Sequence, residues 1–316
     1  MKRVLVAGAT GYLGHYVVKA FNKQGYWVRA LTRSADRLDE LEDYVDEIFI
    51  GAVTDPASLK GICQDIDIVF SSIGITKQKD NLTYMDVDYQ GNKNLLEVAK
   101  KAGVSKLIYI SVFNAEKMSD LKGIQAKLEF TEALKKSGLD YLVVNPNGFF
   151  SDMLEYLRMA KQGRGYVFGT GECRINPIHG EDLAEVCVNA VDEAEREINV
   201  GGPDIFTHNQ ILAIAFESLG KPVKISRIPI WLRNVILATL RLFTSVKTYG
   251  PLEFFMTVLA MDMVAPTYGK HHLKDFFLEN CSGQEETHHE SNGIHRIRAT
   301  GSSSAQRGRK TYCQRG

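Results

Sequence analysis

Short apolar runs alternate with segments of helical periodicity over the first half of the chain. The runs are rich in β-branched residues and predict six strands: Val4–Ala7, Trp27–Thr32, Glu47–Ile50, Asp67–Ser71, Lys106–Ser111 and Tyr141–Val144. Between several of them apolar residues recur at helical spacing, as in Leu13, Val17 and Phe21 before Gly25. Continuous apolar strands separated by helices predict an α/β fold, a doubly wound parallel sheet covered on both faces.

After Val144 glycine and proline interrupt this pattern, and a further helix is expected from about Glu181 to Ala194. We expect residues 1–280 to form one domain with a small C-terminal substrate lobe, built mainly from residues 146–180 and 201–278. From Cys281 onward Ser, Gly, Gln, His and Arg dominate. Such a segment buries too little apolar surface to offset the entropy of ordering it, so residues 281–316 are predicted to be a disordered tail.

The charges balance, with 38 Lys and Arg against 38 Asp and Glu, so no overall field favours binding of nucleic acid. The five cysteines form no CxxC pair and no metal-ligand spacing, and we expect free thiols in a reducing compartment and no metal site. The first strand runs directly into glycines instead of a signal-peptide pattern. We therefore expect a cytoplasmic protein, or one of the plastid stroma if the source is a phototroph.

One apolar region, residues 228–265, raises the question of membrane contact. Charged residues interrupt it, and its longest clean run, Phe254–Met261, is far shorter than the roughly 18 residues that span a bilayer. We expect buried amphipathic helices here, with peripheral membrane contact as the alternative.

The strongest local motif, GATGYLG, follows the first strand and opens a helix. Gly8 allows a sharp turn, Gly11 lets the backbone approach a pyrophosphate, and Gly14 lets the helix pack close to the sheet. The spacing is GxxGxxG, where typical dehydrogenases have GxGxxG. We predict a dinucleotide-binding loop whose members are Gly8, Thr10, Gly11, Tyr12, Leu13 and Gly14.

Coenzyme choice is predicted by the residues that end the second strand. An acid there binds the ribose 2′-hydroxyl of NAD(H), whereas an arginine accommodates the 2′-phosphate of NADP(H). The strand ends in Leu31-Thr32-Arg33-Ser34, with Arg37 one turn later and no acid at the strand end. We therefore expect NADP(H), with NAD(H) less favoured, unless Arg33 is only a solvated surface residue.

Further motifs occur in a fixed order along the chain: Asp55-Pro56, Ser71–Gly74, Tyr109–Ser111, Ala126-Lys127, Asn145–Gly148 and Pro177–Ala184. Together with GATGYLG, they resemble the atypical extended branch of the short-chain dehydrogenase/reductase superfamily, which includes NmrA-like proteins, over residues 1–278. Within this branch the segments Gly169–Gly171, Gly201–Pro203 and Pro266–Lys270 are most similar to divinyl chlorophyllide 8-vinyl reductases. The resemblance implies an NAD(P)-binding Rossmann fold and a small-molecule substrate.

The superfamily places a catalytic tyrosine four residues before a lysine. In this chain Lys127 is present, but the tyrosine position is Gly123. The resemblance then leaves Lys127 a role in binding the nicotinamide ribose, with an exposed helix lysine as the alternative. Alcohol oxidation by the usual mechanism is not expected, because the tyrosine normally transfers the proton. Reduction of a conjugated double bond stays feasible, with Tyr84 and Tyr141 as unselected candidates for the proton donor.

The resemblance also assigns residues at other strand ends. Ser111 would face the substrate as a second catalytic residue, Ser72 and Gly74 would approach the coenzyme through their backbone, and Pro146 and Asn147 would lie near the nicotinamide. Turn or strand-end roles are the alternatives for all five. The sequence thus favours an NADPH-dependent reductase of an unsaturated or quinone-like substrate. A non-catalytic NADP(H) sensor and an assembly factor of a membrane electron-transfer complex stay open, as does the oligomeric state.

Overall fold

A seven-stranded parallel sheet forms the centre of the molecule. The computed structural model describes residues 1–75 and 81–282. In spatial order the strands are β3 (Glu47–Ile50), β2 (Trp27–Thr32), β1 (Arg3–Ala7), β4 (Ile68–Ser71), β5 (Lys106–Ile110), β6 (Asp140–Pro146) and β9 (Glu197–Val200). Every adjacent pair is parallel. The chain first moves outward through β2 and β3 and then reverses at β4, so the sheet has a topological switch point between β1 and β4.

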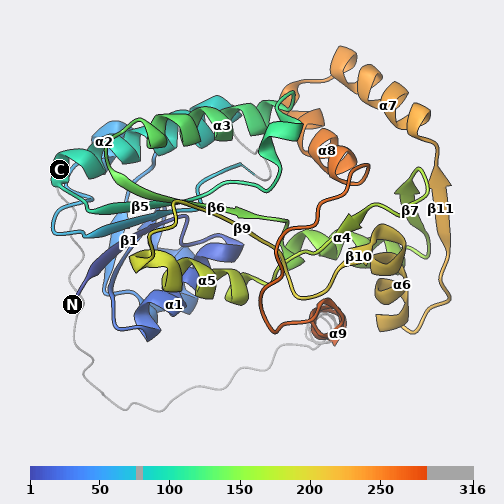
Figure 1. Cartoon of the computed structure of the whole chain (residues 1–316), viewed down its shortest axis with the longest axis horizontal. Helices are drawn as coiled ribbons and strands as arrows, with labels where there is room; N and C mark the ends of the chain where they lie inside the picture. Colours follow the sequence, from blue (N-terminus) through green and yellow to red (C-terminus); the bar gives the residue numbers. More distant parts are fainter. Residues whose placement is uncertain (76–80, 283–316) are drawn as a thin grey trace, which may run out of the picture.

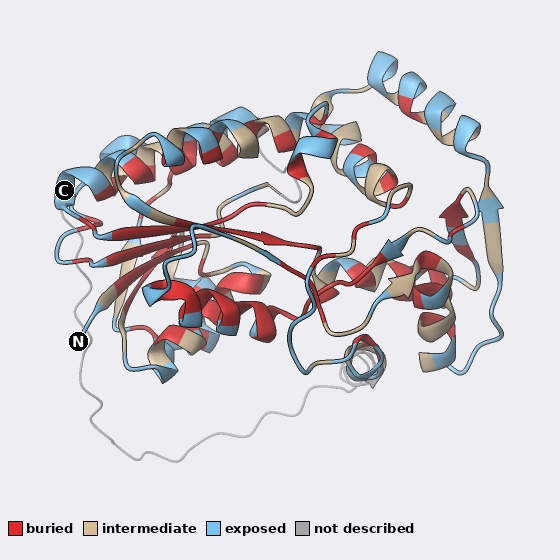
Figure 2. Cartoon of the chain, viewed as in Figure 1, coloured by how far each residue is buried: buried red, intermediate tan, exposed pale blue. Residues whose placement is uncertain are grey.

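Helices cover both faces of the sheet (Figure 1). On one face lie α1 (Tyr12–Lys23) and α5 (Gly180–Asn189), and on the other lie α2 (Asn92–Ala102) and α3 (Lys122–Lys135). Short turns of helix complete the connections: η1 (Ala35–Tyr44), η2 (Pro56–Leu59), η3 (Met85–Gly91), η4 (Ala115–Met118) and η5 (Ala190–Asp192). The doubly wound prediction is confirmed, and buried residues form a continuous apolar layer on each side of the strands (Figure 2).

A second core lies beside the carboxyl ends of the strands. It is enclosed by α4 (Phe150–Lys161), α6 (His208–Ser218), α7 (Ile230–Phe243), α8 (Val246–Val258) and α9 (Leu273–Ser282), and by two small sheets that pair β7 (Gly165–Phe168) with β11 (Ile225–Ile228) and β8 (Arg174–Ile175) with β10 (Phe206–Thr207). Its largest fully buried side chains include Tyr156, Phe150, Phe216 and Phe277. We call this part the second lobe.

Three sequence-based expectations differ from the structure. The strand β9 was not predicted, because Glu-Ile-Asn-Val carries little apolar signal and is recognised only by its pairing with β6. The expectation that the 228–265 region is buried is wrong for α7, in which Leu237 is the only buried residue. The predicted tail falls outside the described residues from position 283 onward, and Cys281 and Ser282 end α9.

Candidate functional site

The phosphate loop joins β1 to α1 at the switch point of the sheet. Gly8 has a φ of +96°, and a Cβ there would lie 2.6 Å from the Ser72 Oγ. A Cβ on Gly14 would lie 2.0 Å from the Gly8 carbonyl oxygen. Gly11 offers no side-chain cap, so the first N–H groups of α1 are open to an anion. These residues fit the pyrophosphate of a dinucleotide, because only glycines leave the cradle free.

Tyr12 and Leu13, two other predicted members of the loop, direct their side chains into contacts within the protein. Leu13 is buried in the core between α1 and the sheet. The Tyr12 hydroxyl accepts a hydrogen bond of 3.0 Å from the N–H of Gly180, which fixes the start of α1 against the start of α5. Thr10 is half-buried. The side chains of Tyr12 and Leu13 therefore position α1, and a contact of their N–H groups with the phosphates stays a prediction.

At the end of β2 the chain turns so that two arginines reach solvent. Thr32 is buried and donates from its hydroxyl to the carbonyl of Ser34 at 2.7 Å, while the N–H of Ser34 donates back to the same hydroxyl at 3.2 Å. Arg33 and Arg37 are exposed beside this turn. No carboxylate occupies the turn from Thr32 to Ser34, so the strand end suits a phosphate better than a ribose hydroxyl.

Asn92, which is fully buried in α2, holds the loop after β4 through side-chain hydrogen bonds. Its side-chain oxygen accepts a hydrogen bond of 2.6 Å from the Ser71 hydroxyl, and its nitrogen donates to the carbonyls of Ile73 and Asp88. The N–H of Ser72 donates to the Ala7 carbonyl at 3.0 Å, which joins this loop to the phosphate loop. Gly74 ends the loop exposed, as a coenzyme contact requires.

Lys127 projects from α3 into the corner beside Gly74. Its Nζ lies 3.2 Å from Oδ1 of Asp88, whose other oxygen accepts a hydrogen bond from the N–H of Ile75 at 3.0 Å. A Cβ on Gly74 would lie 3.1 Å from the same Nζ. Burial lowers the pKa of Lys127, but the Tyr109 hydroxyl and the Asp88 carboxylate outweigh it and hold the pKa above its usual value. The ammonium group therefore stays charged at the strand ends.

Two groups around Lys127, Asp88 and Tyr109, were not predicted from the sequence to be site residues. Asp88 is 1% exposed, and burial raises its pKa against the opposing charge of Lys127. Tyr109 is fully buried in β5, where burial raises its pKa to about 12. A signal for Asp88 was present, since it precedes Asn92, Leu95 and Ala99 at the helical spacing of a buried face, where a carboxylate needs a partner.

The ring of Tyr84 lies against Gly123, the position at which the resemblance places a tyrosine. A Cβ on Gly123 would lie 3.3 Å from two ring carbons of Tyr84, which precedes η3 and is half-buried. Burial raises the pKa of Tyr84, and the nearby carboxylates of Asp88 and Glu253 raise it further. Tyr141, the other sequence candidate, lies beside Arg196 near the amino end of β6, away from the carboxyl ends of the strands.

Ser111 and Asn147 follow β5 and β6 as expected, whereas Pro146 is the last residue of β6. Ser111 lines a polar hollow of about 230 Å³ with residues of β6 and β9, and Lys127 does not line it. The Asn147 side chain is 1% exposed and donates to Asn176 and to the carbonyl of Met263, which ties β6 to the second lobe. The predicted coenzyme contacts of Pro146 and Asn147 stay predictions.

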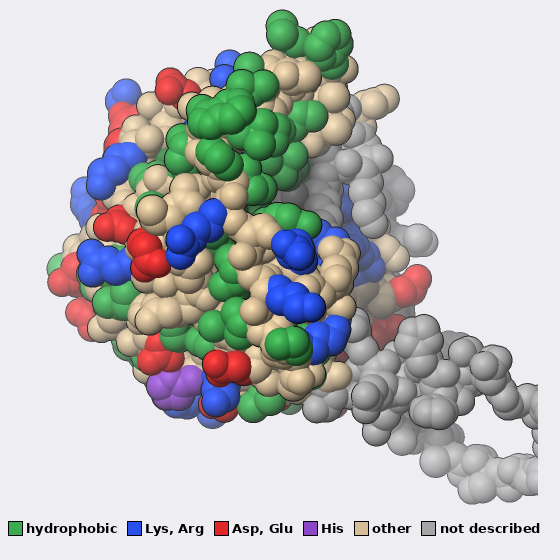
Figure 3. All heavy atoms as spheres, turned by 90° about the vertical axis from the view of Figure 1, so that its right-hand side faces the viewer, with side chains coloured by type: hydrophobic (Ala, Val, Ile, Leu, Met, Phe, Trp, Pro, Cys, Tyr) green, Lys and Arg blue, Asp and Glu red, His purple; other side chains and the backbone are tan. Residues whose placement is uncertain are grey.

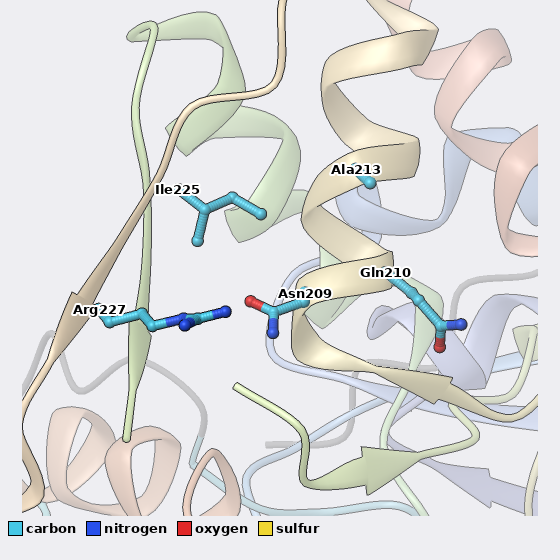
Figure 4. Close-up of a pocket in the computed structure, with 5 residues that line it drawn as sticks. All are labelled: Asn209, Gln210, Ala213, Ile225 and Arg227. Carbon is cyan, nitrogen blue, oxygen red and sulfur yellow. The ribbon is translucent and has the colours of Figure 1, made fainter. Parts of the chain in front are cut away.

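Two further features lie apart from the phosphate loop and from Lys127. His179, Glu181 and His271 bring potential metal ligands within 4.8 Å of one another. Because His179 Nδ1 accepts the N–H of Glu181, its Nε2 carries the proton of the neutral ring and is not a free ligand. An open groove of about 680 Å³ in the second lobe separates β11 from α6, with Arg227 facing Asn209 across it (Figure 4), and no predicted site residue lines it.

Comparison with known proteins agrees with this geometry. Residues 8–194 match the protein family described as NAD(P)H-binding. The chloroplastic divinyl chlorophyllide a 8-vinyl-reductase of Arabidopsis thaliana is 28% identical over 89% of this chain and 78% of its own. The photosystem II assembly factor Ycf39 of Synechocystis is 27% identical over 77% of this chain and 74% of its own.

Solved structures show the same fold at lower identity. The NADPH-dependent quinone oxidoreductase QOR2 of Escherichia coli, in complex with NADPH, superposes with a TM-score of 0.65 at 18% identity, over 88% of this chain and all of that one. Leucoanthocyanidin reductase of Vitis vinifera with NADPH gives 0.68 at 16% identity, over 88% of this chain and 98% of that one.

Proposed function

The chain belongs to the NAD(P)H-binding family, and from that premise we propose that it is an NADPH-dependent reductase of an unsaturated or quinone-like substrate. The observation that carries the proposal is the charged Lys127 beside Gly74, in a site whose usual tyrosine position is Gly123. This arrangement keeps the coenzyme-binding cation and removes the acid-base group of alcohol oxidation. A vinyl tetrapyrrole is the sharpest form of the proposal, because vinyl reductases are among the relatives.

NADPH supplies a hydride, and the residues of the chain bind and orient the reactants. The glycine loop and the start of α1 bind the pyrophosphate, and Arg33 binds the 2′-phosphate. Lys127 binds the nicotinamide ribose, and its positive charge favours the electron-rich product of hydride addition. Asp88 holds the Lys127 ammonium in place. After hydride addition to one carbon of the double bond, the reaction still requires one proton at the other carbon, or at oxygen for a quinone.

Tyr84 is our candidate for the donor of that proton. Its ring covers Gly123, where the family carries its tyrosine, and its raised pKa keeps the hydroxyl protonated at neutral pH. We expect Tyr84→Phe to lower kcat by about 10²-fold or more with little change in NADPH affinity, the usual contribution of a general acid. Tyr141→Phe is the matched control and should leave kcat unchanged, since Tyr141 lies near the amino end of its strand, away from the carboxyl ends of the strands. Equal kcat values for both variants would remove Tyr84 from the mechanism.

The proposal is tested by following NADPH oxidation with divinyl chlorophyllide, simple quinones and conjugated enones. Steady turnover in the wild-type protein, reduced at least tenfold in Lys127→Ala, supports it. Turnover that does not change in Lys127→Ala excludes Lys127 from the reaction. NADPH binding by calorimetry is measured in parallel, so that lost affinity and lost catalysis are separated.

One alternative is supported by a specific observation. A protein that binds NADP(H) without oxidising it needs no catalytic tyrosine, so a glycine at position 123 is compatible with that role. In addition, one group of relatives is named as photosystem II assembly factors. The second candidate is therefore an NADP(H)-sensing regulator or an assembly factor of a membrane electron-transfer complex. Tight NADPH binding with no oxidation on the whole substrate panel would favour it over the reductase.

A further inference from the structure

The helix α7 turns an apolar face away from the protein. Trp231 is 66% exposed, Val235 52% and Leu242 80%. Their spacing of four and seven residues places them on one side of the helix, and Ala238, also exposed, lies between them. Phe243 ends the helix with 81% of its surface exposed. Single exposed apolar residues are ordinary, but a contiguous stripe of this size indicates an interaction surface.

The opposite side of α7 is already packed. Leu237 enters the second core. Arg233 donates from Nη1 to the Met256 carbonyl at 3.2 Å, and Arg241 donates from Nε to the carboxylate of Glu253 at 2.7 Å, so both arginines fasten α7 to α8. The exposed stripe is therefore a second apolar face of an anchored helix, and rotation of α7 into the core would break these bonds.

The segment of sequence that contains the stripe carries charges of one sign. Residues 218–252 contain six Lys or Arg and neither Asp nor Glu, although the whole chain is neutral. Lys224 and Arg227 are exposed just before α7 begins. Figure 3 shows hydrophobic side chains gathered at the top of this face, with basic and acidic side chains below them. An apolar stripe beside an exclusively basic stretch matches a negatively charged apolar boundary.

We propose that α7 docks on the surface of an anionic lipid bilayer. The stripe of Trp231, Val235 and Leu242 enters the interface, and the exposed positive charges of Lys224 and Arg227 attract the anionic headgroups. The helix lies in the plane of the surface, and none of the helices that the structure describes is long and apolar enough to cross a bilayer. A second copy of the chain fits this surface less well, because a two-fold contact brings the two basic stretches together.

The chain offers a built-in reporter for the test. It has two tryptophans, and Trp27 is half-buried near Arg3 and Arg29 on the far side of the sheet. In the Trp27→Phe variant, fluorescence reports Trp231 alone. With vesicles of phosphatidylglycerol and phosphatidylcholine the emission should shift to the blue and be quenched by brominated lipid chains. Unshifted emission at saturating lipid overturns the proposal, and so does a blue shift that depends on protein concentration without lipid, which identifies self-association.

Flotation of the full chain with the same vesicles tests the surface by mutation. Trp231→Ser/Leu242→Ser should lower the bound fraction at least tenfold, and Lys224→Glu/Arg227→Glu should lower binding to anionic but not to neutral vesicles. The matched control Ile205→Ser/Leu278→Ser removes exposed apolar side chains elsewhere and should bind as the wild type does. NADPH binding by each variant shows that it is folded. If the α7 variants and the control variant lose vesicle binding equally, the assignment of the surface to α7 is overturned.

Discussion

Replacing Asp88 by asparagine tests whether a buried charge pair holds Lys127. The carboxylate is almost fully buried and lies 3.2 Å from the Lys127 Nζ, whose side chain is 22% exposed. At that distance and an effective dielectric constant of about 20, the attraction amounts to roughly 5 kcal/mol before desolvation is counted. The amide oxygen of the introduced asparagine would still accept the N–H of Ile75, but its NH2 group would take the place of the oxygen that faces Lys127. The variant therefore loses the charge and the hydrogen-bond acceptor for Lys127 together.

We expect Asp88→Asn to lower the free energy of unfolding by about 3 kcal/mol, the lower end for breaking a buried pair, because Lys127 keeps some contact with water. Lys127→Met should lower the free energy of unfolding by a similar amount, since it leaves the Asp88 carboxylate buried without its cation. The double variant removes both charges, so its loss should be smaller than the sum of the single losses by about 2 kcal/mol.

Urea unfolding of the four proteins at neutral pH measures this coupling. The pH dependence gives a second check. Burial raises the pKa of Asp88 above its unfolded value, so folding favours the protonated acid. The Lys127→Met variant should therefore regain stability relative to wild type as the pH falls through the folded-state pKa of Asp88. If the two single losses add to within about 0.5 kcal/mol, the pair is not coupled and the account of Lys127 positioning is refuted.

Three further predictions concern the coenzyme loop, the coenzyme phosphate and the second lobe. Arg33→Ala should weaken NADPH binding by about tenfold or more, the value of a hydrogen bond to a charged group, and leave NADH binding unchanged in calorimetry. Gly14→Ala should abolish NADPH binding and lower stability by about 1–3 kcal/mol or more, because the new Cβ would lie 2.0 Å from the Gly8 carbonyl. His208 is buried against the Tyr156 hydroxyl, and burial lowers its pKa to about 4. Since the unfolded chain takes up this proton first, stability should fall as the pH drops below about 6.5, and the stability gap between wild type and His208→Gln should narrow by about 2 kcal/mol from pH 7.5 to 5 in urea titrations. A gap that does not change with pH would show that His208 does not control the acid sensitivity.

Local sequence was sufficient for the frame of the fold and the coenzyme loop. Strands such as β1 and β4 are buried on both faces, so their apolar runs are continuous and visible without knowledge of their neighbours. The turn at Gly8 and the close approach at Gly14 are backbone requirements that only glycine meets, so the residue type alone reports them. The NAD(P)H-binding family was predicted correctly for this reason.

Only the tertiary structure decided which side chains meet and which faces stay uncovered. Asp88 and Lys127 lie on different elements, and the crossovers of the sheet, not any local pattern, bring their charges together. In the same way Tyr84 reaches the empty face of Gly123 from a distant segment. The apolar periodicity of α7 predicts a helix, but a helix with two apolar faces does not say which one the protein covers. Periodicity records what a residue prefers, whereas contact depends on how the whole chain is packed around it.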